Sequence, residues 1–382
     1  MEVKQIKDLV NQTTKEVIGE TALQIDDLSQ IVDLGESVYN VKQMDNYIKT
    51  LIDQIGKIVF VNRPYKGTAP KVLMDSWEYG SVLEKISMDE MPEAEENDSW
   101  QLTNGRSYDT NVFNGPKASA KFFNSKNTFD ITMSFADKQV KSAFQNGTQL
   151  NAFMSMIENA IQTSMTVKID SLISSTIASM IAQTLNDGNA NRSVNLLKLY
   201  NARFGTTLTA DKCITDAGFI RWASFYMAQY NKRLCKLSKL FNIGGKERFT
   251  TDDRQYMILL DEFAQAADVY LQSDVRHNEF TKLPNADTVS FWQGCGTDYG
   301  FDSTSAINVS IKTGTTSKTV SQTGILGVLF DKDALGVVCE NKRVTTQYNG
   351  RAEFYNNWYK FDAGYFNDLN ENFVVFYVAD SE

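Results

Sequence analysis

Side chains suited to catalysis or metal binding are scarce in this sequence of 382 residues, which contains one histidine and four cysteines. The histidine, His277, lies in the polar segment 274–279, and no Gly-X-Ser-X-Gly motif supplies a nucleophile for it. The cysteines are widely separated, so no two have the spacing of a metal site or a redox pair. The sequence therefore predicts a non-enzymatic chain without cofactor or metal. The thiols expected to be free are Cys213, Cys235, Cys295 and Cys339.

Long apolar runs and a net positive charge are also missing. No run approaches the roughly 18 apolar residues that cross a bilayer, and no apolar segment follows Met1 to suggest a secretory signal. The formal net charge of −9 disfavours a general nucleic-acid-binding protein, because phosphates attract a basic surface. Hydrophobic residues make up 42% of the chain and charged residues 22%, as in folded globular proteins. We expect a globular chain without a membrane partner.

Segment 294–300 contains three glycines after a predicted strand and superficially resembles a phosphate-binding loop. In a dinucleotide-binding loop the third glycine follows the second at a fixed spacing and opens a helix. Here the spacing differs, and residues 301–305 do not begin a helix. We interpret the segment as a glycine-rich bend. An α/β ligand-binding enzyme that uses this bend remains an alternative.

Two charged stretches are the candidate contact sites. Residues 84–98 contain seven acids at irregular positions that do not match a calcium loop, so they form either a solvated strip or half of an electrostatic contact between subunits. The basic stretch 232–248 is either a solvated helix end or a phosphate contact. The residues predicted to contact a neighbouring subunit are Glu84, Glu93, Glu95, Glu96, Trp100, Lys232, Arg233, Lys236 and Lys239.

The first half of the chain divides into three parts. Residues 1–61 are polar, with helical spacing that ends at Gly56. Residues 62–136 hold four of the five prolines and short alternating runs, which predict a long two-stranded excursion that needs another surface to lie on. From 149 to 185, apolar residues recur at steps of three and four. This spacing predicts one helix of about 50 Å laid across a sheet.

The second half has a mixed α/β pattern and an aromatic end. Helices are expected at 193–204, 216–240 and 262–271, strands at 255–260, 288–292 and 325–330, and a surface hairpin or loop at 303–324. An acidic, helix-compatible turn at 331–335 precedes strands at 343–349 and 373–378. Between Tyr348 and Tyr377 lie eleven aromatic residues and no histidine or cysteine. Such a composition favours packing and contact with neighbours over chemistry.

This order of elements resembles that of the major capsid proteins of tailed bacteriophages with the Hong Kong 97-like fold. The local sequence is most similar in the pattern of its residues to the shell proteins of small short-tailed phages of the phi-twenty-nine group. The segments that carry the resemblance are 47–56, the acids after Gly80, 137–144, 328–335, 348–361 and 373–378.

The resemblance implies an α+β fold with five parts: an N-terminal arm (1–61), an extended E-loop (62–136), a P-domain with a spine helix (137–205), an A-domain (206–335) and a P-domain β return (336–382). It also implies a major capsid protein of the virion, assembled in the host cytoplasm, whose pentamers and hexamers form an icosahedral head. Its further partners would be a portal, a scaffolding protein and, weakly, the packaged double-stranded DNA. Alternatives are an encapsulin-type nanocompartment shell and a tail or baseplate protein.

Overall fold

A computed structural model describes residues 3–18, 25, 30, 47, 50, 72–74, 83–89, 91–92, 94, 96, 98–108, 113, 115–136, 138, 147–272, 286–292, 306–313 and 316–380. The chain forms two compact units. Unit 1 comprises residues 1–70, 126–172 and 338–364, and unit 2 comprises residues 71–125, 173–337 and 365–382. Within the described residues, no helix is long and apolar enough to cross a membrane, and no group of side chains could hold a metal ion.

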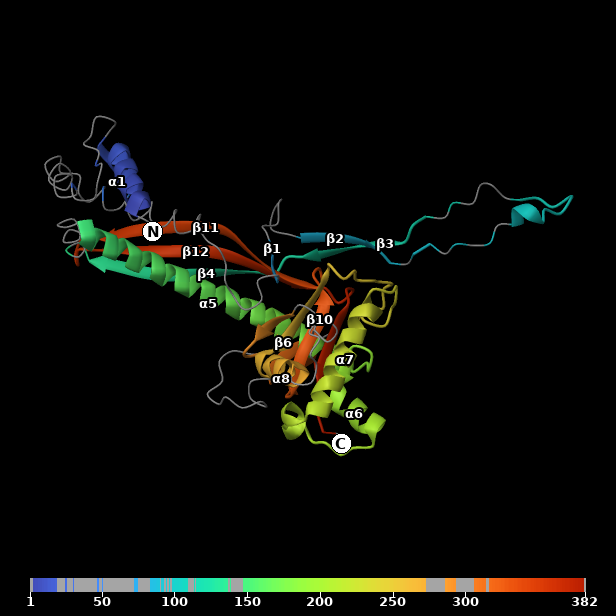
Figure 1. The fold of residues 1–382 in the computed structure, drawn as a ribbon. Coiled ribbons are helices and arrows are strands. Elements are labelled where there is room, and N and C mark those ends of the chain that lie inside the picture. Colours follow the sequence, from blue (N-terminus) through green and yellow to red (C-terminus); the bar gives the residue numbers. More distant parts are fainter. Residues whose placement is uncertain are drawn as a thin grey trace. The chain divides into compact units, whose positions relative to one another are not determined.

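Unit 1 is built from long strands and the first part of a long helix. Its sheet belongs to the order β1-β11-β12-β4, with β11 at Leu335–Asn349, β12 at Phe354–Asn367 and β4 at Lys126–Ala136. Strands β12 and β4 are antiparallel over eleven paired positions. Helix α1 spans Val3–Ile18, whereas the two-residue strand β1, Leu73–Met74, belongs to unit 2. Figure 1 shows β4, β11 and β12 running side by side.

Helix α5, Gly147–Asp187, is the long helix that the apolar spacing predicts. In unit 1, Phe153 of α5 packs edge-on against Phe135 of β4, with ring centroids 5.5 Å apart. The buried apolar side chains of this half recur at helical spacing, since residues three or four apart share a helix face. They include Ile157, Ile161, Met165 and Ile169.

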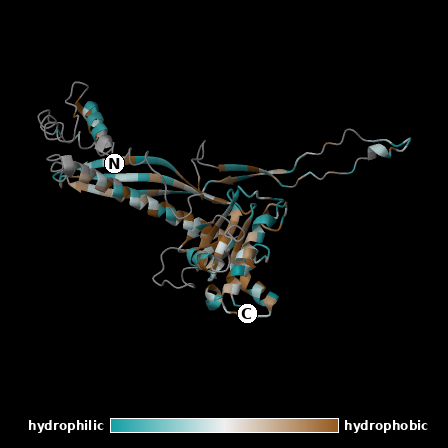
Figure 2. Ribbon diagram, viewed as in Figure 1, coloured by the Kyte–Doolittle hydropathy of each residue, from teal (hydrophilic) through white to brown (hydrophobic). Residues whose placement is uncertain are grey.

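Unit 2 has a five-stranded sheet in the order β5-β13-β10-β6-β7. The strands are β5 (Ser193–Asn195), β13 (Phe373–Tyr377), β10 (Ile325–Asp331), β6 (Gln255–Leu260) and β7 (Ala286–Val289). Strand β10 lies antiparallel between β6 and β13, and all seven of its residues are buried. The central strands are therefore hydrophobic on both faces, as Figure 2 shows.

Helices of unit 2 begin at polar caps and pack aromatic residues on the sheet. Helix α6 is Leu196–Phe204, α7 is Ala217–Leu234 and α8 is Asp261–Gln272, with the 3-10 helix η4 at Ala210–Thr215. Asn195 and Asp216 accept backbone N–H groups at the starts of α6 and α7. Tyr230 of α7 packs edge-on against Phe376 of β13, with centroids 5.3 Å apart. This contact fixes α7 to the sheet.

Two hairpins complete unit 2. Strands β8 (Ile307–Thr313) and β9 (Thr316–Gln322) form the expected hairpin inside segment 303–324. Strands β2 (Leu83–Met88) and β3 (Ala118–Phe123) form the other, and the loop between them contains the 3-10 helix η3, Asp98–Trp100. The end of the predicted excursion differs: residues 126–136 form β4 of the sheet in unit 1 and do not extend this hairpin.

Several boundaries differ from expectation for physical reasons. The turn expected at 331–335 is present, with residues 332–334 between β10 and β11. The helix expected from 193, by contrast, begins only at Leu196, because residues 193–195 pair with β13 as β5. Helix α7 ends at Leu234 and not near 240, since Ser238 and Arg248 form a backbone bridge that takes the chain out of the helix. Among the described cysteines, Cys213 and Cys235 are free thiols. The five-part division of the chain stays a prediction.

Candidate functional site: the β2–β3 hairpin

Hairpin β2–β3 has two chemically different faces, because side chains alternate in direction along a strand. On the inner face, Lys85 lies directly opposite Lys121, and Ser87 lies opposite Ser119. The outer face consists of exposed residues of both strands, namely Glu84, Ile86, Met88, Ala118, Ala120 and Phe122. Two lysines placed opposite each other repel, so this pairing requires an acid beside them.

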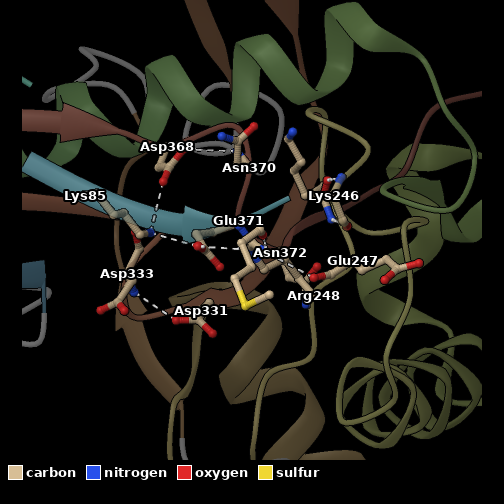
Figure 3. A network of polar contacts seen from close by, with 12 residues as sticks. Lys85, Lys246, Glu247, Arg248, Asp331, Asp333, Asp368, Asn370, Glu371 and Asn372 are labelled. Atoms are coloured by element: carbon tan, nitrogen blue, oxygen red, sulfur yellow. Dashed lines mark hydrogen bonds and ion pairs between the residues drawn. The ribbon is translucent and has the colours of Figure 1, made fainter. Parts of the chain in front are cut away.

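The acid is Asp368, whose side chain is only 2% exposed. Its Oδ2 lies 2.9 Å from Nζ of Lys85, and its Oδ1 lies 3.1 Å from Nζ of Lys121, so each oxygen binds one strand. Lys85 also lies 2.8 Å from Oε1 of Glu371 and donates to the carbonyl oxygen of Asp333 at 3.2 Å. Figure 3 shows Lys85 between these acids. The turn between β12 and β13 therefore holds both strands of the hairpin.

The protonation states of this cluster follow from burial and pairing. Burial alone lowers the pKa of Lys85, but the carboxylates of Glu371 and Asp368 outweigh it, so this pKa lies above the ordinary value. Burial alone raises the pKa of Asp368. The ammonium of Lys85, the backbone N–H of Asn370 and the charge of Lys121 outweigh it and hold this pKa below the ordinary value. Both pKa shifts favour the charged form, so Lys85 and Asp368 are both charged at neutral pH.

Arg248 provides a second attachment farther along the hairpin. Its Nη1 donates to the carbonyl oxygen of Met88 at 3.0 Å, and its Nε lies 3.4 Å from Oε1 of Glu371. The backbone bridge with Ser238 holds Arg248 in the loop after α7. Arg248 thus connects the end of β2 to the same acid that binds Lys85 near its start (Figure 3).

The beginning of the loop after β2 is attached to the same segment. Nζ of Lys246 lies 2.6 Å from Oδ1 of Asp89, and this oxygen also accepts the hydroxyl of Ser119 at 2.7 Å. The Lys246 and Ser119 hydrogen bonds hold the pKa of Asp89 below its ordinary value. The backbone N–H of Met91 donates to Oε2 of Glu247 at 3.0 Å. The attachment therefore extends past the end of β2 to Met91.

The outer face and the loop expose large hydrophobic side chains. Ile86 is 70% exposed and Phe122 62%, while in the loop Trp100 is 95% exposed and Phe113 91%. Hairpins that pack on a protein normally turn their apolar face inward. The inner face of this hairpin is apolar only at the pair Leu83 and Phe123, and farther along it carries Lys85 and Lys121. Contiguous apolar surfaces of this kind mark contact sites for another molecule.

The acidic contact candidates lie on this hairpin and its loop. Glu84 is exposed on the outer face, while Glu96 and Trp100 are exposed in the loop. One acid of segment 84–98, Asp89, is paired within the chain with Lys246 of the basic stretch. Outside the described residues lie Glu93, Glu95, His277 and the bend 294–300.

The basic contact candidates lie at the end of α7 and after it. Lys232 forms an ion pair with Asp252 at 2.9 Å, and Lys239 forms one with Glu247 at 3.5 Å. The other two candidates are Arg233 and Lys236, both exposed. The guanidinium of Arg233 lies over tyrosine rings of its own helix. Whether these residues meet a neighbouring subunit stays a prediction.

Sequence reasoning missed the residues that attach the hairpin. Lys121 and Asp368 are 247 positions apart, and both are common residue types. One signal was present: aligning the alternating segments 83–88 and 118–123 places Lys85 beside Lys121, which requires an acid nearby. That signal does not say which acid it is.

Comparison with known proteins identifies the family. The model of the Phi29-like phage major capsid protein family matches residues 10–377. Comparison with curated proteins gives no match. Solved structures similar to this chain include the capsid of Staphylococcus phage Andhra, with a TM-score of 0.49 and 11% identity over 81% of this chain and 83% of that chain. Microbacterium phage Oxtober96 gives a TM-score of 0.44 with 9% identity over 84% and 93%. The capsid of Cyanophage P-SCSP1u gives 0.43 with 13% identity over 81% and 87%.

Because the family model spans nearly the whole chain, the protein belongs to the Phi29-like phage major capsid proteins. It is a structural protein of the phage capsid shell and a component of the virion, where it acts as an oligomer. The α+β architecture, with a long helix, an extended hairpin and an aromatic β return, is that of the Hong Kong 97-like fold expected from the sequence.

Proposed function

We propose that this chain builds a closed icosahedral head from pentamers and hexamers, without catalysing a reaction. In this proposal, the outer face of hairpin β2–β3 and the loop 89–117 lie on a neighbouring copy. A portal and a scaffolding protein are further partners during assembly in the host cytoplasm. Packaged double-stranded DNA is confined with only weak contact, in keeping with the net charge of −9.

One observation carries the proposal. The hairpin uses its charged face for its own subunit, so its apolar outer face, with Ile86 and Phe122, is left for a partner. An isolated two-stranded hairpin is marginally stable in water, and an exposed apolar face lowers its solubility. A second copy of the chain covers that face at every position of a shell.

The test replaces the apolar outer face by small polar side chains. The double variant Ile86→Ser/Phe122→Ser should fold with an unfolding midpoint close to that of the wild type, because both side chains are already exposed. It should form no closed particles in negative-stain electron microscopy and in sedimentation, whereas the wild type forms shells.

The matched control is Val269→Ser, which removes a hydrophobic side chain that is 64% exposed on α8. This variant should assemble like the wild type. Closed particles of normal yield from the Ile86→Ser/Phe122→Ser variant would contradict the proposed contact. A well-folded wild-type chain that stays monomeric at high concentration and at every salt concentration would contradict self-assembly without other proteins.

A further inference from the structure

The hairpin is held to its own subunit mainly by charge. On the inner face, the apolar contact is confined to the end next to the body of the subunit, where the ring of Phe123 lies 5.0 Å from that of Phe366. Farther along, the inner face carries Lys85, Lys121 and two serines. Hydrophobic packing tolerates sliding, whereas paired charges fix the positions of particular atoms.

Because the acids of these ion pairs are buried, the loss of one ion pair affects the others. Asp368 is almost fully buried, and Glu371 and Arg248 are largely buried as well. Lifting the hairpin away would leave Asp368 without both of its lysines. A desolvated carboxylate without a partner is strongly unfavourable, so intermediate positions of the hairpin are disfavoured. Positions of the hairpin that keep Asp368 covered but unpaired are therefore unfavourable.

We propose that these residues form a charged clamp that fixes the direction in which hairpin β2–β3 leaves its subunit. The clamp consists of Lys85, Lys121, Arg248, Asp368 and Glu371. It presents the loop 89–117 to the neighbouring copy in one orientation. This role rests on the proposed function, although the clamp itself is a property of a single chain. Its members are positioning residues, because they act through the hairpin and not by touching the neighbour.

Because hairpin β2–β3 is attached to its subunit at two separate points, it cannot rotate about either one, and its direction is fixed. Lys85 is bound near the start of β2, and the carbonyl of Met88 is bound by Arg248 at its end. Three strand residues span about 10 Å. Asp89 adds a third contact through Lys246. A hairpin held at one point could swing, whereas these attachments along its length prevent it from doing so.

Hydrogen exchange of the unassembled full-length chain tests the clamp without any neighbour. Lys85→Met and Asp368→Asn each remove one charge and preserve side-chain size. Both should speed amide exchange in β2 and β3 roughly tenfold or more, because the hairpin then opens locally. Exchange in β10 and β13 should stay unchanged. Lys85→Arg retains the charge and should restore most of the protection.

The matched control is Lys126→Met, which breaks another partly buried ion pair, with Glu340 at 2.8 Å, only three residues after β3. It should leave exchange in β2 and β3 unchanged. The double variant Lys85→Met/Asp368→Asn should speed exchange by less than the product of the two single effects, because the two residues share one ion pair, although Lys85 also binds Glu371 and Asp368 also binds Lys121. Hairpin rates within about twofold of the wild type would overturn the clamp. So would equal acceleration in β10 and β13, since the residues would then serve the whole core.

Assembly of the same variants separates the clamp from the proposed function. Folded Lys85→Met should form irregular sheets or open tubes in place of closed particles. If its hairpin is loosened and closed particles still form in wild-type yield, the positioning role is overturned while the capsid function stands. If loosened hairpins abolish closure but Ile86→Ser/Phe122→Ser assembles normally, the clamp stands and the outer-face contact fails.

Discussion

At the scale of single residues, Arg192 ties together three segments of unit 2. Its Nε donates to Oδ2 of Asp187 at the end of α5, at 2.7 Å. Its Nη1 donates to the carbonyl oxygens of Leu240 and Asn242 at 3.2 and 2.9 Å. The guanidinium has five donors in a fixed plane, which suits several acceptors at once. Arg192 thus connects the helix end to the loop that precedes Arg248.

Replacing Arg192 by alanine should destabilise unit 2 by about 3 kcal/mol, because a partly buried carboxylate and two carbonyl oxygens lose their donor. Arg192→Lys should cost less, since an ammonium can serve one of these acceptors but not all. Chemical denaturation of the full-length chain measures both. The control Arg203→Ala, at an exposed position of α6, should change the free energy of unfolding by less than about 0.5 kcal/mol. Equal costs for Arg192→Ala and Arg203→Ala would contradict the role of Arg192.

At the scale of elements, the continuity and the burial of α5 are separate properties that two substitutions can distinguish. Ile169 is buried in the middle of the helix. Ile169→Pro should cost about 3 kcal/mol or more, because proline removes a backbone hydrogen bond and clashes with the preceding turn. Ile169→Ala removes only side-chain packing and should cost about 2–5 kcal/mol.

The control for burial is Val167→Ala on the same turn, where the side chain is 59% exposed and the change should be within about 0.5 kcal/mol. Unfolding midpoints and particle formation measure all three variants. Proline tolerated at 169 with assembly intact would show a break in the helix at that point. A small cost for Ile169→Ala alone would show that the site can collapse around the lost side chain.

The elements recoverable from sequence are those whose signal is local. The spacing of apolar residues predicted a helix over 149–185, and α5 spans Gly147–Asp187. The buried run 325–330 likewise matches β10. By contrast, the alternating segment 126–136 has the same pattern whether it extends a hairpin or lies in a sheet. Only its pairing with β12, more than two hundred positions later, decides the matter.

For the candidate site, the sequence predicted a two-stranded excursion but not the contacts that attach hairpin β2–β3 to its subunit. The sequence indicated an extended hairpin region with acids and Trp100, and of these Glu84, Glu96 and Trp100 are exposed in the described residues. Its attachment could not be predicted, because Lys85 and Asp368 lie far apart in sequence and ion pairs leave no periodic pattern. The boundary at Leu234 was missed for the same reason, since the bridge between Ser238 and Arg248 depends on tertiary contacts.

At the scale of the whole molecule, some charged side chains form ion pairs within the chain, and others are exposed and can contact another chain. Asp89 is paired with Lys246, but the loop continues with Glu93, Glu95 and Glu96, of which Glu96 is exposed. Exposed ion pairs are individually worth less than about 1 kcal/mol, but a shell repeats each of them many times. Such contacts are screened over about 10 Å at 0.1 M salt. Assembly should therefore depend on ionic strength more steeply than folding of the subunit does.

Neutralising these three acids to glutamine should flatten the salt dependence of assembly and leave the unfolding midpoint nearly unchanged. Light scattering of assembly across salt concentrations, compared with denaturation of the same samples, measures the two effects. The matched control neutralises three acids elsewhere in unit 2, namely Asp211, Glu262 and Asp268, and should retain the wild-type salt profile. If the loop variant also retains it, the acids are only solvated. Attraction between shell subunits then comes from the apolar outer face, since hydrophobic contacts do not weaken with screening.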